Sequence, residues 1–321
     1  MSVLVYTENW DGKFKKASYE LVSYATQVAE MLNTSVTAIS IGKVNDDELL
    51  KLGGFGATKI LKADDQHLNG LDNQAYTDII ARAAIEEGAG VIVFSHNNTG
   101  KALASRLSVR LKAAVGAGLI KLPVSLSPFI VYKKVFSGKA FAQVELKTEV
   151  KILTLMQNSF ELVEADSRAE IVSFAGETGV PKTVIKDVQK QTGKILLTDA
   201  EVVVSGGRGM KSPDNWGVIE ELADALGAAT ACSRPVSDEG WRSHDEHTGQ
   251  TGKIIAPNLY IAAGISGAIQ HMAGISSTKC IVAINTDSDA PVFEYADYGV
   301  VGDALKVLPA LTRAVKEAKS K

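Results

Sequence analysis

The chain has 321 residues, of which 45% are hydrophobic and 22% charged, and its formal net charge is −3 at pH 7. This length allows two globular domains, and the slight acidic excess argues against a nucleic-acid-binding protein, which needs a basic surface. Two cysteines are too few for a disulfide framework, so we expect a cytoplasmic protein.

The first half of the chain alternates short apolar strands with amphipathic helices. We expect strands at 2–6, 36–41, 59–62 and 91–94, and helices at 17–32, 76–87 and 101–115. Such alternation predicts a parallel sheet that is buried on both faces. The pattern then changes to strands with short turns, at 129–132, 140–146 and 149–155. These strands predict an antiparallel addition at the edge of the sheet.

The polar segment 181–194 marks the expected domain boundary, so the predicted domains are 1–190 and 191–321. Alternation resumes after it, with strands expected at 202–204, 259–262, 280–284 and 298–301, and helices at 215–226, up to His271, and at 303–318. The predicted fold is therefore two α/β domains: a parallel sheet with antiparallel additions, and a doubly wound parallel sheet.

The most apolar long stretch, 254–275, has the length of a membrane span. Polar residues and proline interrupt it, namely Pro257, Asn258, Gln270 and His271. Each would be costly in lipid, so we expect a buried strand followed by a buried helix, and no membrane insertion.

Two glycine-rich junctions, 205–209 and 264–268, follow strands and precede helices in the second half. Ligands of open α/β sheets bind at such junctions, where the free N–H groups of helix N-termini suit phosphates. Neither junction is a GxGxxG fingerprint, and each alone is more often a structural turn.

Three other groups of residues are candidate sites, but they lack the pattern that a functional site requires. The segment 97–101 lacks the first glycine of a phosphate loop, and we expect Asn98 or Thr99 to cap a helix there. His244 and His247 lack a clear third ligand, so no metal site is predicted. The cysteines, Cys232 and Cys280, are expected to be small buried residues.

Six sequence blocks after residue 200 resemble, in order and spacing, the FAD domain of electron-transfer flavoprotein α subunits. They are VVSGGRGMKS at 203–212, SRPV at 233–236 with GW at 240–241, GQTGKIIAPNLY at 249–260, GISGAIQH at 264–271, VAIN at 282–285 and ADYG at 296–299. The departures from the family pattern are Cys232, Pro235 and Thr248, where a small residue, alanine and an aliphatic residue are more usual. These departures could shift the potential or the solvent access of the flavin.

The resemblance implies bound FAD and the residues that hold it. The cofactor-binding residues that it implies are Arg208, Ser233, Arg234, Thr248, Gly249, Gln250, Thr251, Ser266, Gly267, Ala268, Ile269, Gln270, His271, Asn285, Asp303 and Ala304. Arg208 and 205–207 would lie along the phosphates and adenosine, and 266–271 near the pyrophosphate and ribityl chain. Asn285, Asp303 and Ala304 would hold the adenosine end, and Arg234, Thr251 and His271 would surround the isoalloxazine ring.

A fixed positive charge beside the ring stabilises the negative charge that forms on reduction. We assign Arg234 the larger electrostatic role because arginine stays charged while histidine titrates. The plainer alternatives are a surface ion pair for Arg234, a turn cap for Thr251 and a core histidine for His271. Trp216 and Trp241 are expected to pack rather than to stack on the flavin.

The resemblance further implies an electron carrier without substrate turnover of its own. It would pair with a β subunit, accept electrons from acyl-CoA or other dehydrogenases and deliver them to a quinone oxidoreductase, and its FAD domain would swivel on 181–194. The alternatives are an electron-bifurcating member of the family with a second FAD in the β subunit, a stand-alone flavin or NAD oxidoreductase, and a nucleotide-binding structural module.

Overall fold

The computed structural model of this chain describes residues 2–65, 68, 70–136, 138–165, 168–174, 183, 186–187 and 195–320. The chain divides into two compact units, residues 1–135 with 140–188 and residues 189–321 with 136–139, and each is described by itself. The expected boundary segment, 181–194, lies outside the described residues except for Thr183, Lys186 and Asp187.

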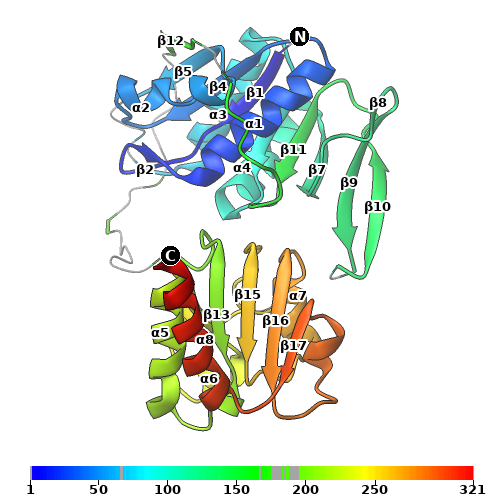
Figure 1. The fold of residues 1–321 in the computed structure, drawn as a ribbon. Helices are drawn as coiled ribbons and strands as arrows, with labels where there is room; N and C mark the ends of the chain where they lie inside the picture. Colours follow the sequence, from blue (N-terminus) through cyan, green and yellow to red (C-terminus); the bar gives the residue numbers. More distant parts are fainter. Residues whose placement is uncertain are drawn as a thin grey trace. The chain divides into compact units, whose positions relative to one another are not determined.

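The first unit is built on a ten-stranded sheet (Figure 1). Its strands are β1 (Ser2–Tyr6), β4 (Val36–Ile41), β5 (Lys59–Ala63), β6 (Ala89–Ser95), β7 (Ala114–Leu119), β8 (Ser125–Leu126), β9 (Phe129–Val135), β10 (Ala140–Glu145), β11 (Lys151–Leu155) and β12 (Glu170–Ser173). The order is β10-β9-β7-β11-β6-β1-β4-β5-β12, with β8 paired to β9. Neighbours from β7 to β12 are parallel, and β9 runs antiparallel to β7, β8 and β10. A separate ribbon pairs β2 (Asn9–Trp10) with β3 (Lys13–Phe14).

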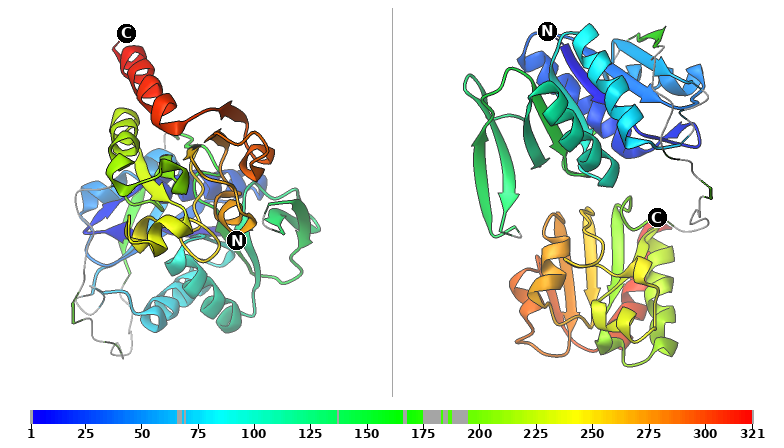
Figure 2. Two further views of the ribbon diagram at one scale, coloured as in Figure 1. Left: turned by 90° about the horizontal axis from the view of Figure 1, so that it is seen from below. Right: turned by 180° about the vertical axis from the view of Figure 1, so that it is seen from behind.

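Helices cover both faces of this sheet, as the alternating strands require. They are α1 (Lys16–Met31), α2 (Asp46–Leu50), the 3₁₀ turn η1 (Gly53–Phe55), α3 (Asn73–Glu86) and α4 (Asn98–Leu111). On the face seen in Figure 1, Leu21 and Tyr24 of α1 share a core with Val3. On the opposite face, turned to the viewer at the right of Figure 2, α3 and α4 form a second core with Leu4 and Ile92. The predicted parallel α/β sheet is confirmed.

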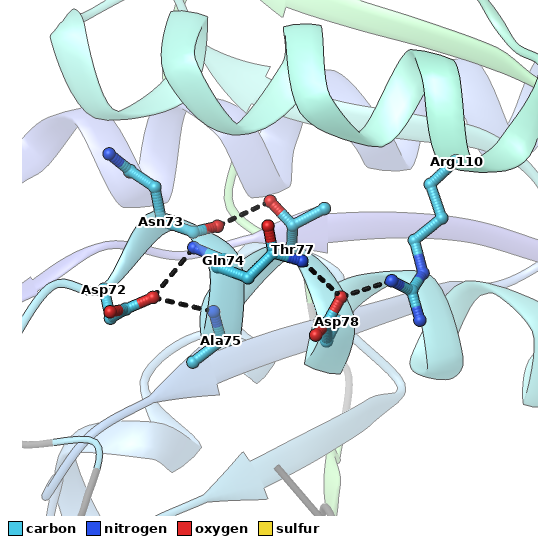
Figure 3. A network of polar contacts seen from close by, with 7 residues as sticks. All are labelled: Asp72, Asn73, Gln74, Ala75, Thr77, Asp78 and Arg110. Atoms are coloured by element: carbon cyan, nitrogen blue, oxygen red, sulfur yellow. Dashed lines mark hydrogen bonds and ion pairs between the residues drawn. The ribbon is translucent and has the colours of Figure 1, made fainter. Parts of the chain in front are cut away.

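Helix α3 begins three residues before the expected position, because Asp72 caps it. The Asp72 carboxylate accepts hydrogen bonds from the backbone N–H groups of Gln74 and Ala75, both at 2.9 Å (Figure 3). These bonds satisfy two of the free donors of the first turn. Arg110 of α4 then forms an ion pair with Asp78, which joins the two helices on their exposed side.

Three local expectations in this unit are wrong. The helix expected to run to residue 115 ends at Leu111, and β7 follows it. The N-cap of this helix is Asn97 and not Asn98 or Thr99 as expected, since Asn97 Oδ1 accepts from the N–H of Gly100 at 2.8 Å. Strand β11 is not the partner of a hairpin: it lies inside the sheet, parallel to both β6 and β7. The antiparallel edge is formed by β8, β9 and β10.

The second unit holds a five-stranded sheet that is parallel throughout. Its strands are β13 (Val202–Gly206), β14 (Ala229–Cys232), β15 (Leu259–Ala263), β16 (Cys280–Asn285) and β17 (Tyr298–Val301), in the order β14-β13-β15-β16-β17. The helices are α5 (Gly217–Leu226), α6 (Arg234–Asp238), α7 (Ile269–Ile275) and α8 (Ala304–Lys319), with 3₁₀ turns η3 (Arg208–Met210), η4 (Pro213–Trp216), η5 (His244–Glu246) and η6 (Pro291–Glu294).

Alternate strand residues of this sheet face two separate cores. Val204 contacts the side covered by α5 and α8, and Val203 contacts the side covered by α7. The doubly wound arrangement predicted for this half is therefore confirmed. Trp216 is buried in the first of these cores, as expected of a packing residue, and Cys232 is buried there too, whereas Cys280 is only half-buried.

The apolar stretch 254–275 is divided between strand β15 and helix α7, as its polar interruptions predicted. Within the described ranges, none of the helices combines the length and the apolar run that crossing a membrane would require.

Candidate functional site

A cavity of about 560 Å³ opens at the carboxyl ends of the strands of the second unit. Its walls are the loops after β13, β14, β15 and β16, together with the segment 247–251. The carboxyl edge is where open α/β sheets bind their ligands, and the volume falls in the range of about 300–1,000 Å³ typical of small-molecule sites.

Most of the residues that the sequence pointed to line this one cavity. They are Arg208, Ser233, Arg234, Thr248, Gly249, Gln250, Thr251, Ser266, Ala268, Gln270, His271 and Asn285. They come from four different strand–helix connections and the segment 247–251, so the fold, and not sequence proximity, brings them together.

Four predicted residues lie outside the cavity wall. Gly267 has φ +87° and packs against Val292, whose backbone N would lie 2.3 Å from an added Cβ. Ile269 is exposed and Ala304 is buried in the core beneath α8. Asp303 caps α8 by accepting from the N–H of Leu305 at 3.0 Å. Gly267, Asp303 and Ala304 have structural roles here, and the expected contacts of all four residues with the cofactor stay predictions.

Three glycines join the loops that follow β13 and β15. The N–H of Gly209 donates to the carbonyl of Gly264 at 3.0 Å, and a Cβ on Gly209 would lie 2.6 Å from the Cα of Gly264. A Cβ on Gly207 would lie 2.2 Å from the Gly264 oxygen. Gly264 itself has φ +61°, a conformation that glycine adopts without strain. The two backbones therefore touch directly and leave room above them for a ligand.

Arginine side chains stand at two places on the wall. Arg234, at the start of α6, forms an ion pair with Asp238, its Nε lying 3.2 Å from Oδ2, and its side chain is 64% exposed. Arg208 lies 4.0 Å from Glu239 and is 67% exposed. Exposed pairs of this kind contribute about 0–1 kcal/mol, so both guanidinium groups can turn to an anionic ligand at small cost.

A network around Arg242 holds the segment after α6 against the rest of the unit. Its guanidinium donates two hydrogen bonds to Glu246, at 2.9 and 2.8 Å, and pairs with Glu220 of α5 at 2.9 Å. The guanidinium also lies 5.5 Å from the Trp216 ring. These half-buried contacts anchor both ends of the connection that leads from α6 to residue 247, and they hold that wall of the cavity in place.

His271 faces the cavity from the first turn of α7 and is buried. Its Nε2 lies 2.9 Å from the hydroxyl of Tyr260, which lies 3.2 Å from Oγ1 of Thr248. Its Nδ1 has no hydrogen-bond partner among the described residues. Burial lowers the pKa of His271 to about 4, although the backbone of Thr248 opposes this change. The imidazole is therefore neutral near pH 7.

This lowered pKa predicts a stability loss in acid. The unfolded chain, with an ordinary histidine pKa near 6.5, binds a proton that folded His271 rejects until about pH 4. Stability is thus highest above pH 6.5 and falls as the pH drops toward 4, by about 3 kcal/mol in all. His271→Gln should lose less stability between pH 7 and pH 5 in urea unfolding. The exposed His244→Gln should lose as much as the wild type, and an equal loss in all three proteins would contradict this account.

Sequence reasoning missed several wall residues, among them Asp238, His247 and Asp287. The sequence marks His247 only as a candidate metal ligand, yet it lies next to the predicted cofactor-binding residues 248–251, and this adjacency was the available signal. Its partner in that motif, His244, instead bonds Ser237, with 2.7 Å between Nδ1 and Oγ. Within the described ranges, no group of three His, Cys, Asp or Glu residues is placed to hold a metal ion.

Comparison with known proteins places both halves of the chain in one family. Residues 3–178 match the family model described as "Electron transfer flavoprotein domain", and residues 196–276 match "Electron transfer flavoprotein FAD-binding domain". "Electron transfer flavoprotein subunit alpha" of Syntrophomonas wolfei is 37% identical over 98% of each chain. The protein of that name from Bacillus subtilis is 34% identical over 98% of this chain and 97% of its own. "Protein FixB" of Escherichia coli is 35% identical over 92% and 94%.

Proposed function

This chain belongs to the electron-transfer flavoprotein family and is similar to its α subunits, and we propose that it is an electron carrier without substrate turnover of its own. Its second unit contains the family's FAD-binding domain. The observation that carries the proposal is the gathering of twelve of the sixteen predicted cofactor residues around one cavity at the carboxyl edge of that unit's sheet.

The residues present fit FAD. The wall offers two exposed arginines for phosphate oxygens, Arg208 and Arg234. The contact between Gly209 and Gly264 lets a ligand approach the backbone, because neither loop carries a Cβ there. The unpartnered Nδ1 of His271 is buried at the wall, and such an atom calls for a polar partner. Exposed cations, close backbone approach and a buried polar atom thus lie on one wall, and this set suits a ligand that carries phosphates and a polar ring.

Bound FAD supplies the chemistry of accepting and releasing electrons. We assign Arg208 to the phosphates, because its guanidinium follows the first glycine loop directly. Arg234 supplies a fixed positive charge to the ring end, while Thr251 and His271 offer neutral hydrogen bonds there. Asn285 is held on the wall, because its Nδ2 donates to the Ile265 carbonyl and its Oδ1 accepts from the N–H of Asp287, both at 3.0 Å, and we assign it to the adenosine end.

We further propose that the domain 1–190 packs on a β subunit, as an α subunit of this family implies. The heterodimer would take electrons from acyl-CoA or other dehydrogenases and deliver them to a quinone oxidoreductase. The cavity wall carries imidazoles and carboxylates, which in an enzyme could act as general acid or base. The residues that we assign to the ring end are instead Arg234, Thr251 and a neutral His271, and this set is suited to storing electrons on the ring.

The test is a measurement of flavin content and reductive titration on the chain purified with its partner subunit. We expect about one FAD per heterodimer, reduced without any organic substrate and reoxidised by a quinone oxidoreductase. Two FAD per heterodimer would move the proposal to the electron-bifurcating form. A folded heterodimer without FAD would overturn it, and turnover of an organic substrate by the isolated chain would favour a stand-alone oxidoreductase.

A further inference from the structure

The cavity wall contains a second imidazole, His247, to which the family resemblance assigns no role in binding FAD. His247 directly follows the turn η5, and only 8% of the residue is exposed. It lines the same cavity as Arg234 and Thr251, two of the residues that we assign to the ring end. A buried histidine in this place can add a positive charge to the wall or withhold it, because its charge changes near physiological pH.

The imidazole of His247 lies against the turn at 249–252, which forms part of the cavity wall. A Cβ added to Gly252 would lie 2.8 Å from Nδ1 of His247, and one added to Gly249 would lie 3.4 Å from its Nε2. The backbone closes the turn, since the N–H of Gly252 donates to the Gly249 carbonyl at 3.1 Å and the N–H of Lys253 donates to the His247 carbonyl at 2.8 Å. Both ring nitrogens therefore lie close to this turn, and packing fixes where a charge on the ring stands.

Charged and titratable groups surround His247 on the elements beside it. They are Arg234 and Asp238 of α6, His244 of η5, His271 of α7 and Cys232 of β14. Cys232 and His271 are uncharged near pH 7, because burial raises the pKa of the thiol to about 12 and lowers the pKa of the imidazole to about 4. The charges next to His247 in the sequence are paired, namely Glu246 with Arg242 at 2.8 Å and Lys253 with Asp245 at 3.4 Å.

These surroundings set the protonation of His247. Burial lowers its pKa from the ordinary value of 6.5, and the Asp238 carboxylate opposes this change. The positive charges of Arg234 and His244 lower the pKa further. The imidazole is therefore neutral near pH 7 and gains a proton in mild acid. A negative charge that develops in the cavity favours the protonated form, so it raises this pKa again.

We propose that His247 couples the first reduction potential of bound FAD to pH. This deepens the proposed function and rests on it for the presence of FAD. The imidazolium stabilises negative charge on the flavin ring, so the reduced protein binds the proton more tightly than the oxidised protein does. When one electron enters from the donor protein, up to one proton enters His247 from water. By linkage, the potential rises as the pH falls through the pKa of His247, and it is constant well above that pKa.

The test is a potentiometric titration of the FAD-loaded heterodimer from about pH 8 to about pH 5. We expect the reduced form to bind the proton roughly tenfold more tightly, so the first potential should rise toward acid by about 59 mV. His247→Gln keeps a polar side chain without a titrating group, and its potential should stay nearly constant. His244→Gln is the matched control, because it removes a nearby imidazole that bonds Ser237, and it should keep the rise.

NMR of the His247 ring adds a readout that a purely structural role would not change. The pKa of His247 should lie below 6.5 with FAD oxidised and should rise on full reduction. A constant wild-type potential, or a pKa that reduction does not change, overturns the proposal even if His247→Gln does not fold. An unchanged rise in a folded His247→Gln protein overturns it as well. A folded heterodimer without FAD overturns the proposed function, and this inference with it.

Discussion

Gly209→Ala is expected to abolish most FAD binding, although it adds only one methyl group. The new Cβ would lie 2.6 Å from the Cα and 2.8 Å from the oxygen of Gly264, and backbone atoms cannot rotate away as a side chain can. The loops after β13 and β15 must therefore move apart, and the hydrogen bond between them, at 3.0 Å, is lost. Strain of this kind costs about 1–3 kcal/mol, and each 1.4 kcal/mol is about tenfold in affinity.

The measurement is FAD affinity by fluorescence titration, with urea unfolding beside it to separate binding from folding. Gly217→Ala is the matched control, because no described atom lies within 4 Å of its added Cβ and it sits at the start of helix α5. That variant should bind FAD as the wild type does. Equal affinity in the Gly209→Ala protein would show that the glycine contact does not shape the site.

Arg234→Met is expected to lower the first reduction potential of bound FAD, and this is the largest electrostatic effect that we predict. A unit charge within about 8 Å of a developing negative charge is worth about 2 kcal/mol at an effective dielectric constant near 20, or about 90 mV for one electron. The Arg234 side chain is 64% exposed, and solvent screens part of this interaction. We therefore expect a fall of about 30–90 mV.

Arg208→Met is the matched control for Arg234→Met. Both arginines are exposed cavity residues in weak ion pairs, and methionine removes the charge of each while keeping an unbranched apolar stem. If Arg208 lies along the phosphates, its loss should weaken FAD binding and leave the potential nearly unchanged. Potentiometric titration of both variants distinguishes the two roles. A potential that falls equally in both, or in neither, would contradict the assignment of Arg234 to the ring.

Much of the fold could be predicted from the local sequence pattern of apolar runs, amphipathic helices and glycine clusters. Apolar runs such as 202–204 that are followed by amphipathic helices indicate buried strands, and a helix that crosses over between two neighbouring strands makes them parallel. Glycine clusters after strands marked the loops that line the cavity, because only glycine allows two backbones to touch there. The six blocks after residue 200 identified the family, and with it most of the cavity wall.

Contacts between elements that are distant in the sequence could not be predicted from local patterns. Strand β11 has the same pattern as a hairpin strand, yet it pairs with β6 and β7, because strand pairing depends on long-range packing and not on the strand's own sequence. Strand β14, whose sequence is Ala-Thr-Ala-Cys, carries no apolar run and was not predicted. Asn97 caps α4, whereas Asn98 and Thr99, which follow it, do not, and the hydrogen bond from the N–H of Gly100 to Asn97 Oδ1 distinguishes them.

Periodicity, turn geometry and motif order were enough to predict the two α/β units, the glycine loops and the family of this protein. The three-dimensional structure was needed to show that Tyr260 lies behind His271, that Asp238 pairs with Arg234 beside the cavity, and that Asp303 caps a helix outside it. Burial and hydrogen-bond partners are set by packing between residues that are far apart in the sequence. They fix whether a histidine is charged or neutral, and no local pattern contains that information.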